Sequence, residues 1–162
     1  MERGKHMASF TVDYSKANQR YNVPDGEYEV IIQGVAFNMT AGGTEYISVK
    51  TRVRDDYKQP EQGESIEYPL WKSRPENSKS SDIEGVPAWK IHQLSKAAQL
   101  PEGTTIDAID DWFKALQDKP IRVTTKQDDQ GRAKVVRVEE SMAPAPKPAG
   151  FTPVDTSEEL PF

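Results

Sequence analysis

Residues 44–54, TEYISVKTRVR, alternate two kinds of side chain, and this alternation suggests a binding chemistry. One set is apolar or small, and the other combines an aromatic ring, a hydroxyl and three cations: Tyr46, Ser48, Lys50, Arg52 and Arg54. A period of two is typical of a β-strand with one buried and one exposed face. The exposed face would attract a polyanion. The same pattern also fits an ordinary half-buried strand whose charges only contact water.

A second strand, expected at residues 64–72, adds an aromatic residue to this surface. Three of its apolar residues alternate toward the expected core: Ile66, Tyr68 and Leu70. Trp71 points the other way and is followed by two cations, Lys72 and Arg74. Because an exposed tryptophan on a strand is uncommon, it indicates a contact surface. We therefore expect Trp71, Lys72 and Arg74 to extend the cationic surface of residues 44–54.

Catalytic and metal chemistry find little support. The chain has no cysteine and two histidines, which excludes disulfides, thiolate zinc sites and a cysteine nucleophile. A metal-dependent nuclease would need clustered carboxylates, and the paired ones are Asp55-Asp56, Asp110-Asp111 and Asp128-Asp129. All three pairs lie at expected turns or helix starts, where aspartate is common for structural reasons. We expect neither an enzyme nor a bound metal or cofactor.

Length and charge limit the class of protein. With 162 residues, 35% of them hydrophobic, the chain can build one domain of ordinary size. Its net charge of -5 argues against nucleic acid in general, since domains that bind phosphates are usually basic. A polyanion would therefore need a local row of cations. No apolar run is long enough to span a membrane and no export leader is recognisable, so we expect an intracellular protein without a membrane partner.

Composition divides the chain into four segments. Residues 1–22 are polar and irregular and are expected to form an N-terminal arm; MERGKH precedes a second methionine and is interpreted as an added leader or an upstream start. Residues 23–140 carry the strand and helix patterns. Residues 141–154 are rich in proline and predict an extended linker. Residues 155–162 are acidic and end in Leu-Pro-Phe. Such a segment would fit a partner pocket with a hydrophobic floor and a basic rim. A frayed acidic tail without a partner explains the same composition.

The order of the expected elements indicates a fold class. Strands are predicted at residues 27–37, 44–54, 64–72, 119–126 and 132–139, with a bulge at Gln33-Gly34. Helices are predicted at residues 87–98 and 106–116, with Trp89, Trp112 and Phe113 as anchors in the core. Five strands with helices between the third and fourth follow the order of the OB-fold. This all-β Greek-key barrel binds oligonucleotides or oligosaccharides on the face of its second and third strands.

The predicted face coincides with the cationic surface described above. Tyr46 and Trp71 would stack on unpaired bases, while five cations would contact the phosphates of the same strand: Lys50, Arg52, Arg54, Lys72 and Arg74. Stacking does not depend on base identity, and no set of side chains is arranged to read base edges, so we expect a weak sequence preference.

Two resemblances agree with this interpretation. The last residues, SEELPF, resemble the acidic tip of bacterial single-stranded-DNA-binding proteins, with glutamates in place of the usual aspartates. The body resembles a family of bacteriophage proteins, formerly filed as a domain of unknown function, that are regarded as phage-encoded single-stranded-DNA-binding proteins. The matching segments are PDGEYEVII at residues 24–32, TEYISVKTRVRDD at residues 44–56 and YPLWK at residues 68–72.

The resemblance implies an OB-fold that coats single strands during phage replication and recombination, in the cytoplasm of an infected bacterium. It also implies that the tip recruits other replication or recombination proteins through Glu158, Glu159, Leu160, Pro161 and Phe162. We further hypothesise that the acidic tip competes with DNA for the cationic surface. Two alternatives remain: an adaptor or phage structural protein that does not bind DNA and uses its barrel as a scaffold, and, less favoured, the nuclease. A homo-oligomer is compatible with the sequence.

Overall fold

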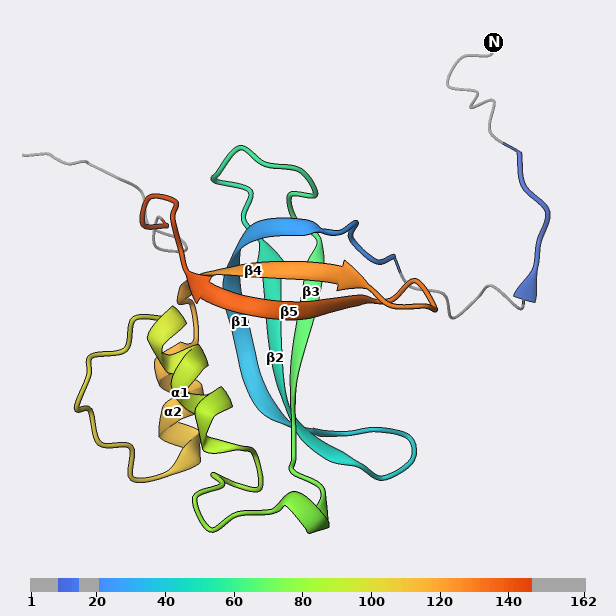
Figure 1. Ribbon diagram of the computed structural model, residues 1–162. Helices are drawn as coiled ribbons and strands as arrows, with labels where there is room; N and C mark the ends of the chain where they lie inside the picture. Colours follow the sequence, from blue (N-terminus) through green and yellow to red (C-terminus); the bar gives the residue numbers. More distant parts are fainter. Residues whose placement is uncertain (1–8, 15–20, 147–162) are drawn as a thin grey trace, which may run out of the picture.

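The first strand, β1 (Gly26–Met39), connects the two halves of the sheet in the computed structural model, which describes residues 9–14 and 21–146 (Figure 1). Its first part, from Gly26 to Ile31, pairs with β4 (Pro120–Gln127). Its second part, from Val30 to Met39, pairs with β2 (Glu45–Val53). The register shifts between Ile32 and Gly34, where the chain passes from one partner to the other. The predicted bulge at Gln33-Gly34 is thus confirmed, and it lets one strand bend to serve both halves.

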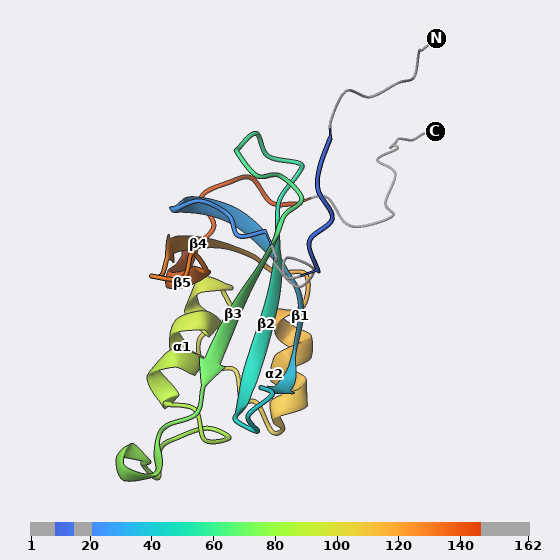
Figure 2. The ribbon, with the colours of Figure 1, turned by 90° about the vertical axis from the view of Figure 1, so that its right-hand side faces the viewer.

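The described part of the sheet has five antiparallel strands in the order β3-β2-β1-β4-β5. The edge strands are β3 (Ser65–Trp71) and β5 (Ala133–Glu140). Curling of the sheet brings these two edges into contact, although no hydrogen-bonded ladder joins them in the described residues. Figure 1 shows β4 and β5 crossing the upper part of β1 to β3, and Figure 2 shows from the side that they lie to the left of these strands. The result is a mostly β, barrel-like fold built on an open sheet.

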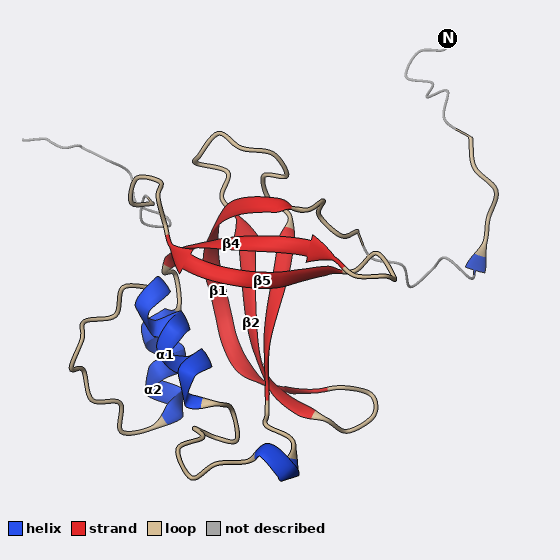
Figure 3. Cartoon of the chain, viewed as in Figure 1, coloured by secondary structure: helices blue, strands red, loops and turns tan. Residues whose placement is uncertain are grey.

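Two helices follow β3 in the chain and pack against the sheet (Figure 3). The first, α1 (Ala88–Ala97), contacts β5, and the second, α2 (Ile109–Leu116), contacts β1. A short 3-10 helix, Pro75–Asn77, lies in the loop before α1. The predicted insertion of helices between the third and fourth strands is confirmed. Within the described residues, none of these helices has the length and apolar character required to cross a bilayer.

The core lies between the inner face of the curled sheet and the helices. The strands contribute Val30, Ile32, Ile47, Val49, Leu70, Ile121 and Val123, and the helices contribute Leu94 and Leu116, all of them fully buried. Each such side chain stabilises the fold by about 1.5–3 kcal/mol relative to an exposed position. The predicted alternation of β2 is confirmed on this face, where Ile47, Val49, Thr51 and Val53 are buried.

The helix predictions need two corrections. Trp112 and Phe113 do pack in or against the core, but Trp89 is 61% exposed and is no core anchor. In α1 the buried face contains Ile91, and Trp89 lies two residues earlier, roughly 200° around the helix. The second helix starts at Ile109, three residues later than residue 106, and Ile106 is 38% exposed. The predicted tip, residues 155–162, lies outside the described residues, as do residues 1–8 and 15–20 of the predicted arm.

Candidate nucleic-acid interface

The outer face of β2 and β3 carries the aromatic and charged residues that alternate with the core residues. In the antiparallel register Tyr46 lies opposite Trp71 and Lys50 lies opposite Glu67. Directly opposed residues of an antiparallel pair have side chains on the same face, about 4.5–5.5 Å apart at Cβ. The fold therefore places Trp71 beside Tyr46, as the sequence pattern predicts, and puts a carboxylate among the cations.

Tyr46 and Trp71 form a ring pair with unequal exposure. Their ring centroids are 4.6 Å apart and the planes are tilted by 39°. Tyr46 is 8% exposed, whereas Trp71 is 41% exposed. Burial, together with the neighbouring Glu67 carboxylate, raises the pKa of the Tyr46 phenol. The phenol hydroxyl donates to Glu67 Oε2 at 3.3 Å. Trp71 is thus the exposed ring of the pair, and Tyr46 is the buried ring against which it packs.

Four of the five predicted phosphate-binding cations lie at the surface. Lys50 and Arg74 are exposed and make no ion pair in the described part of the chain. Arg52 contacts Asp55 at 3.2 Å with its side chain 40% exposed. Lys72 contacts Glu45 at 2.6 Å and lowers the pKa of that carboxyl. Exposed ion pairs of this kind contribute about 0–1 kcal/mol, so a phosphate can replace the carboxylate at little cost.

Arg54, the fifth predicted cation, does not lie on the exposed face. Its side chain is 2% exposed and donates from Nε and Nη2 to the two oxygens of Asp56, at 2.8 and 3.1 Å. Nη2 also donates to the carbonyl of Pro144 at 2.7 Å. β2 ends at Val53, so the two-residue alternation no longer governs the direction of Arg54. The residue holds the chain after β5 against the end of β2, and it has no free surface for a phosphate.

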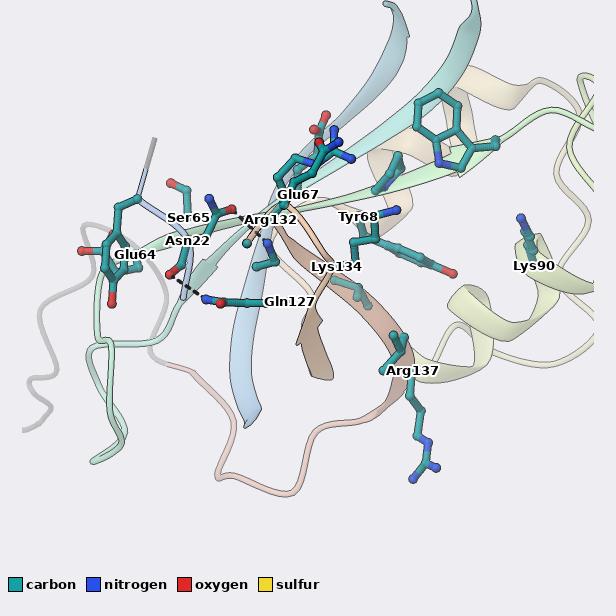
Figure 4. A pocket seen from close by; sticks show the side chains of 18 of the residues that line it. Asn22, Glu64, Ser65, Glu67, Tyr68, Lys90, Gln127, Arg132, Lys134 and Arg137 are labelled. Atoms are coloured by element: carbon teal, nitrogen blue, oxygen red, sulfur yellow. Dashed lines mark hydrogen bonds between the residues drawn. The ribbon is translucent and has the colours of Figure 1, made fainter. Parts of the chain in front are cut away.

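A long groove extends this surface beyond β3 (Figure 4). One wall is the outer face of β3, with Ser65, Glu67, Pro69 and Trp71. The other wall is formed by β5, the loop between β4 and β5, and the start of α1. The groove is present because the edges of β3 and β5 approach each other without pairing. Pattern reasoning did not predict this second wall.

The groove has its own aromatic and cationic residues. Cations outnumber carboxylates four to two: Lys90, Arg132, Lys134 and Arg137 against Glu64 and Glu67. Trp89 is exposed here, and the Lys90 ammonium lies 5.6 Å from its ring centroid. Tyr21 lines the end near the arm, and its hydrogen bond to Glu61 raises its pKa to about 12. A protein with a net charge of -5 thus presents a locally positive groove with exposed rings on both walls.

Asp128 lies in the loop between β4 and β5 and contacts two of these cations, Arg132 in the loop and Lys134 at the start of β5. Its carboxylate accepts hydrogen bonds from the backbone amides of Gln130 and Arg132, both at 2.9 Å, and from Arg132 Nε at 3.0 Å. These contacts, led by the Arg132 amide, lower the pKa of Asp128. Lys134 Nζ lies 3.7 Å from the same carboxylate. The loop is therefore held in one shape at the rim of the groove.

A family model described as "Protein of unknown function (DUF669)" matches residues 10–148. The chain belongs to this family. The matched region includes every described strand and helix, and therefore both walls of the groove. It stops before the acidic tip at residues 155–162. A search of curated proteins finds no match.

In this DUF669 protein five of the six paired carboxylates contact an arginine or lie in the first turn of a helix; Asp129 does neither in the described residues. Asp55 contacts Arg52, Asp56 contacts Arg54, and Asp128 holds its own loop. Asp110 and Asp111 lie in the first turn of α2, where negative charge stabilises the helix. In residues 9–14 and 21–146, no three histidine, aspartate or glutamate side chains converge at a point that could hold a metal ion.

Proposed function

We propose that this protein binds single-stranded DNA of many sequences along the outer face of β2 and β3 and the adjoining groove. One observation carries the proposal: exposed tryptophans, Trp71 and Trp89, line the same groove as four cations on an otherwise acidic protein. Bases would stack on the rings and phosphates would contact the cations. Following the resemblance described above, we place this activity in phage DNA replication and recombination, in the cytoplasm of the infected bacterium.

We assign the fold to the OB class on three features. The strand order β3-β2-β1-β4-β5 is antiparallel throughout, the two edge strands meet, and both helices lie between β3 and β4 in the chain. OB-folds are five-stranded, partly open Greek-key barrels that bind oligonucleotides on the face of the second and third strands. That face carries Trp71, Lys50 and Arg52 here.

A single strand suits this surface better than a duplex. Trp71 and Trp89 offer flat apolar rings that can only be covered by bases that have left their own stack. In a duplex the bases are stacked on each other, and only the phosphates could reach the groove cations. Each stacked base is worth about 1–3 kcal/mol, so a duplex would lose this contribution at both tryptophans.

The acidic tip is proposed as a docking site for replication and recombination proteins, on the basis of its sequence. The described chain before it is fixed to the sheet, because Glu29 accepts hydrogen bonds from Ser141 Oγ at 2.6 Å and from the Met142 amide at 3.1 Å. Deleting residues 155–162 should abolish capture of such partners. If the tip also competes with DNA, the deletion should tighten single-strand binding at low salt, and unchanged affinity would rule out the competition.

The decisive experiment is a fluorescence anisotropy titration of a labelled single strand, with unlabelled single-stranded and duplex competitors, over a series of salt concentrations. We expect the single strand to compete far better than the duplex. We also expect the affinity to fall as the salt concentration rises, because lysine and arginine side chains that contact phosphates displace the counterions condensed on the DNA. Equal competition by the duplex would refute the proposal. No binding at all would favour the adaptor or structural role, and magnesium-dependent loss of the oligonucleotide would reveal a nuclease.

A further inference from the structure

Glu67 is a carboxylate in the wall of a groove whose charge is otherwise mainly positive. It lies on the outer face of β3, directly opposite Lys50 on β2. The two side chains form no ion pair within 4.0 Å, although cross-strand neighbours of opposite charge commonly do. For a surface that only needs to attract phosphates, a carboxylate at this position is unfavourable, so its presence calls for a different role.

Neutral hydroxyl groups hold the Glu67 side chain in place. Ser48 Oγ donates to Glu67 Oε2, and so does the Tyr46 hydroxyl, at 3.3 Å. Within the described residues, Oε1 accepts no hydrogen bond. The carboxylate is therefore held through Oε2, and Oε1 keeps its capacity to accept a hydrogen bond from a ligand in the groove that Glu67 lines.

The same contacts place Glu67 close to the stacking surface. The phenol ring of Tyr46 packs against Trp71, and its hydroxyl reaches Glu67. One phenol ring therefore bridges the indole and the carboxylate. A base lying on Trp71, or the next base along the strand, would have its hydrogen-bonding edge within reach of Glu67 Oε1.

We infer that Glu67 reads the edge of a bound base and favours bases that carry an exocyclic amino group. A carboxylate only accepts hydrogen bonds, so it pairs with the N4 amino group of cytosine at the outer end of the base edge. At the same place uracil and thymine present the O4 oxygen, and their one edge donor, N3–H, lies between two carbonyl oxygens that repel a carboxylate. The inference rests on the proposed binding of single strands. It adds a preference at one position to a surface that otherwise tolerates any sequence.

The test compares oligo(dC) with oligo(dU) of equal length, bound to the full chain at near-neutral pH. Both are pyrimidines without a methyl group, so they stack similarly and differ at the edge that Glu67 would face. We expect the wild-type protein to bind oligo(dC) about fivefold more tightly, at the low end of what a specific base contact provides. In Glu67→Gln an amide can present either its oxygen or its amino group, so the two affinities should become equal, mainly through a gain for oligo(dU).

Glu64→Gln is the matched control, because Glu64 lines the same groove and the substitution removes the same charge. It should raise both affinities together and leave their ratio unchanged. Thermal unfolding of each variant checks that the fold is retained. Equal binding of oligo(dC) and oligo(dU) by the wild type, or a preference that survives in Glu67→Gln, would overturn the inference and leave single-strand binding intact. Failure to bind either strand would instead overturn the proposed function.

Discussion

The indole of Trp71 packs against the phenol ring of Tyr46 across the β2–β3 ladder, with ring centroids 4.6 Å apart. The two rings come from neighbouring strands and differ in their exposure to solvent. Tyr46, at 8% exposure, is covered by its neighbours, and Trp71, at 41%, is partly exposed to solvent. Because a tilted pair of this kind adds about 0.5–1.5 kcal/mol beyond the area that it buries, Tyr46 also restricts the movement of the indole. The strand face thus presents one exposed indole that packs on a buried phenol ring.

Replacing Trp71 should show how much its ring contributes to single-strand binding. We expect Trp71→Ala to weaken single-strand binding by about 1–3 kcal/mol, because one stacked base loses its partner. Trp71→Phe keeps an aromatic ring against Tyr46 and should retain most of the affinity. Anisotropy titrations at one salt concentration would measure both. An alanine variant that binds as tightly as the wild type would exclude Trp71 from the interface.

Replacing the two helix tryptophans with alanine should have different effects: loss of Trp89 should mainly weaken binding, and loss of Trp112 should mainly weaken the fold. Trp89 is 61% exposed in the groove, so Trp89→Ala should reduce affinity by about 1–3 kcal/mol and change stability by no more than about 0.5 kcal/mol. Trp112 is 2% exposed and its Nε1 donates to Ser95 Oγ at 2.8 Å. Trp112→Ala should therefore destabilise the fold by about 3–5 kcal/mol.

Urea unfolding and binding titrations of the two tryptophan variants, run in parallel, would check this contrast. A stability loss in Trp89→Ala comparable with that of Trp112→Ala would show that the ring of Trp89 belongs to the core after all.

Local pattern was sufficient to place the elements of this fold. Alternation and turn residues locate all five strands to within about two residues, and the slip at Gln33-Gly34 correctly marks the bulge in β1. Helical spacing finds both helices and the insertion point between β3 and β4. These features depend on residues a few positions apart, which is the range over which strand and helix periods act.

The groove could not be predicted from local sequence patterns, because its walls come from β3, β5 and α1, which are far apart in the sequence. Arg132, Lys134 and Arg137 are recognisable in the sequence as cations in or next to the last strand, but only the curl of the sheet brings them into one groove with β3. The burial of Tyr46 depends on the β2–β3 register, which a period of two does not specify. The predicted place of Arg54 on the exposed face of the strand is wrong, because the strand ends one residue before it.

Arg52 and Arg54 are two residues apart and should have separate roles. Arg52→Ala should leave stability within about 0.5 kcal/mol of the wild type, since its ion pair with Asp55 is exposed. It should weaken single-strand binding and lower the slope of log affinity against log salt by about 0.7, the value for one phosphate contact on a single strand.

Arg54→Ala should instead reduce stability and leave the salt dependence of single-strand binding unchanged. It removes the guanidinium that donates to Asp56 and to the Pro144 carbonyl, and we expect a loss of about 2 kcal/mol in stability. This is less than for a fully buried pair, because Asp56 remains about a third exposed. Salt-series titrations and urea unfolding of both variants would measure the two effects, and a reduced salt slope in Arg54→Ala without destabilisation would return that residue to the binding surface.

The Asp128 carboxylate predicts how the loop between β4 and β5 responds to acid. Its pKa is lowered in the folded state by the amides of Arg132 and Gln130 and by the Arg132 guanidinium. A lowered folded pKa means that the unfolded chain binds the proton more readily. The stabilisation by Asp128 is therefore fully present above the unfolded value of about 3.9 and is lost as pH falls through the lower folded value.

Asp128→Asn should accordingly be less stable than the wild type at neutral pH, and the difference should shrink as pH falls below about 4. Urea unfolding at a series of pH values would follow this convergence. Asp129→Asn is the matched control, because it removes the same charge from the adjacent position, where the described structure shows no hydrogen bond or ion pair to the carboxylate. Since Asp128 also fixes Arg132 at the groove, Asp128→Asn should weaken single-strand binding at neutral pH as well. A stability difference that stays constant down to acidic pH would show that the carboxylate charge does not hold the loop.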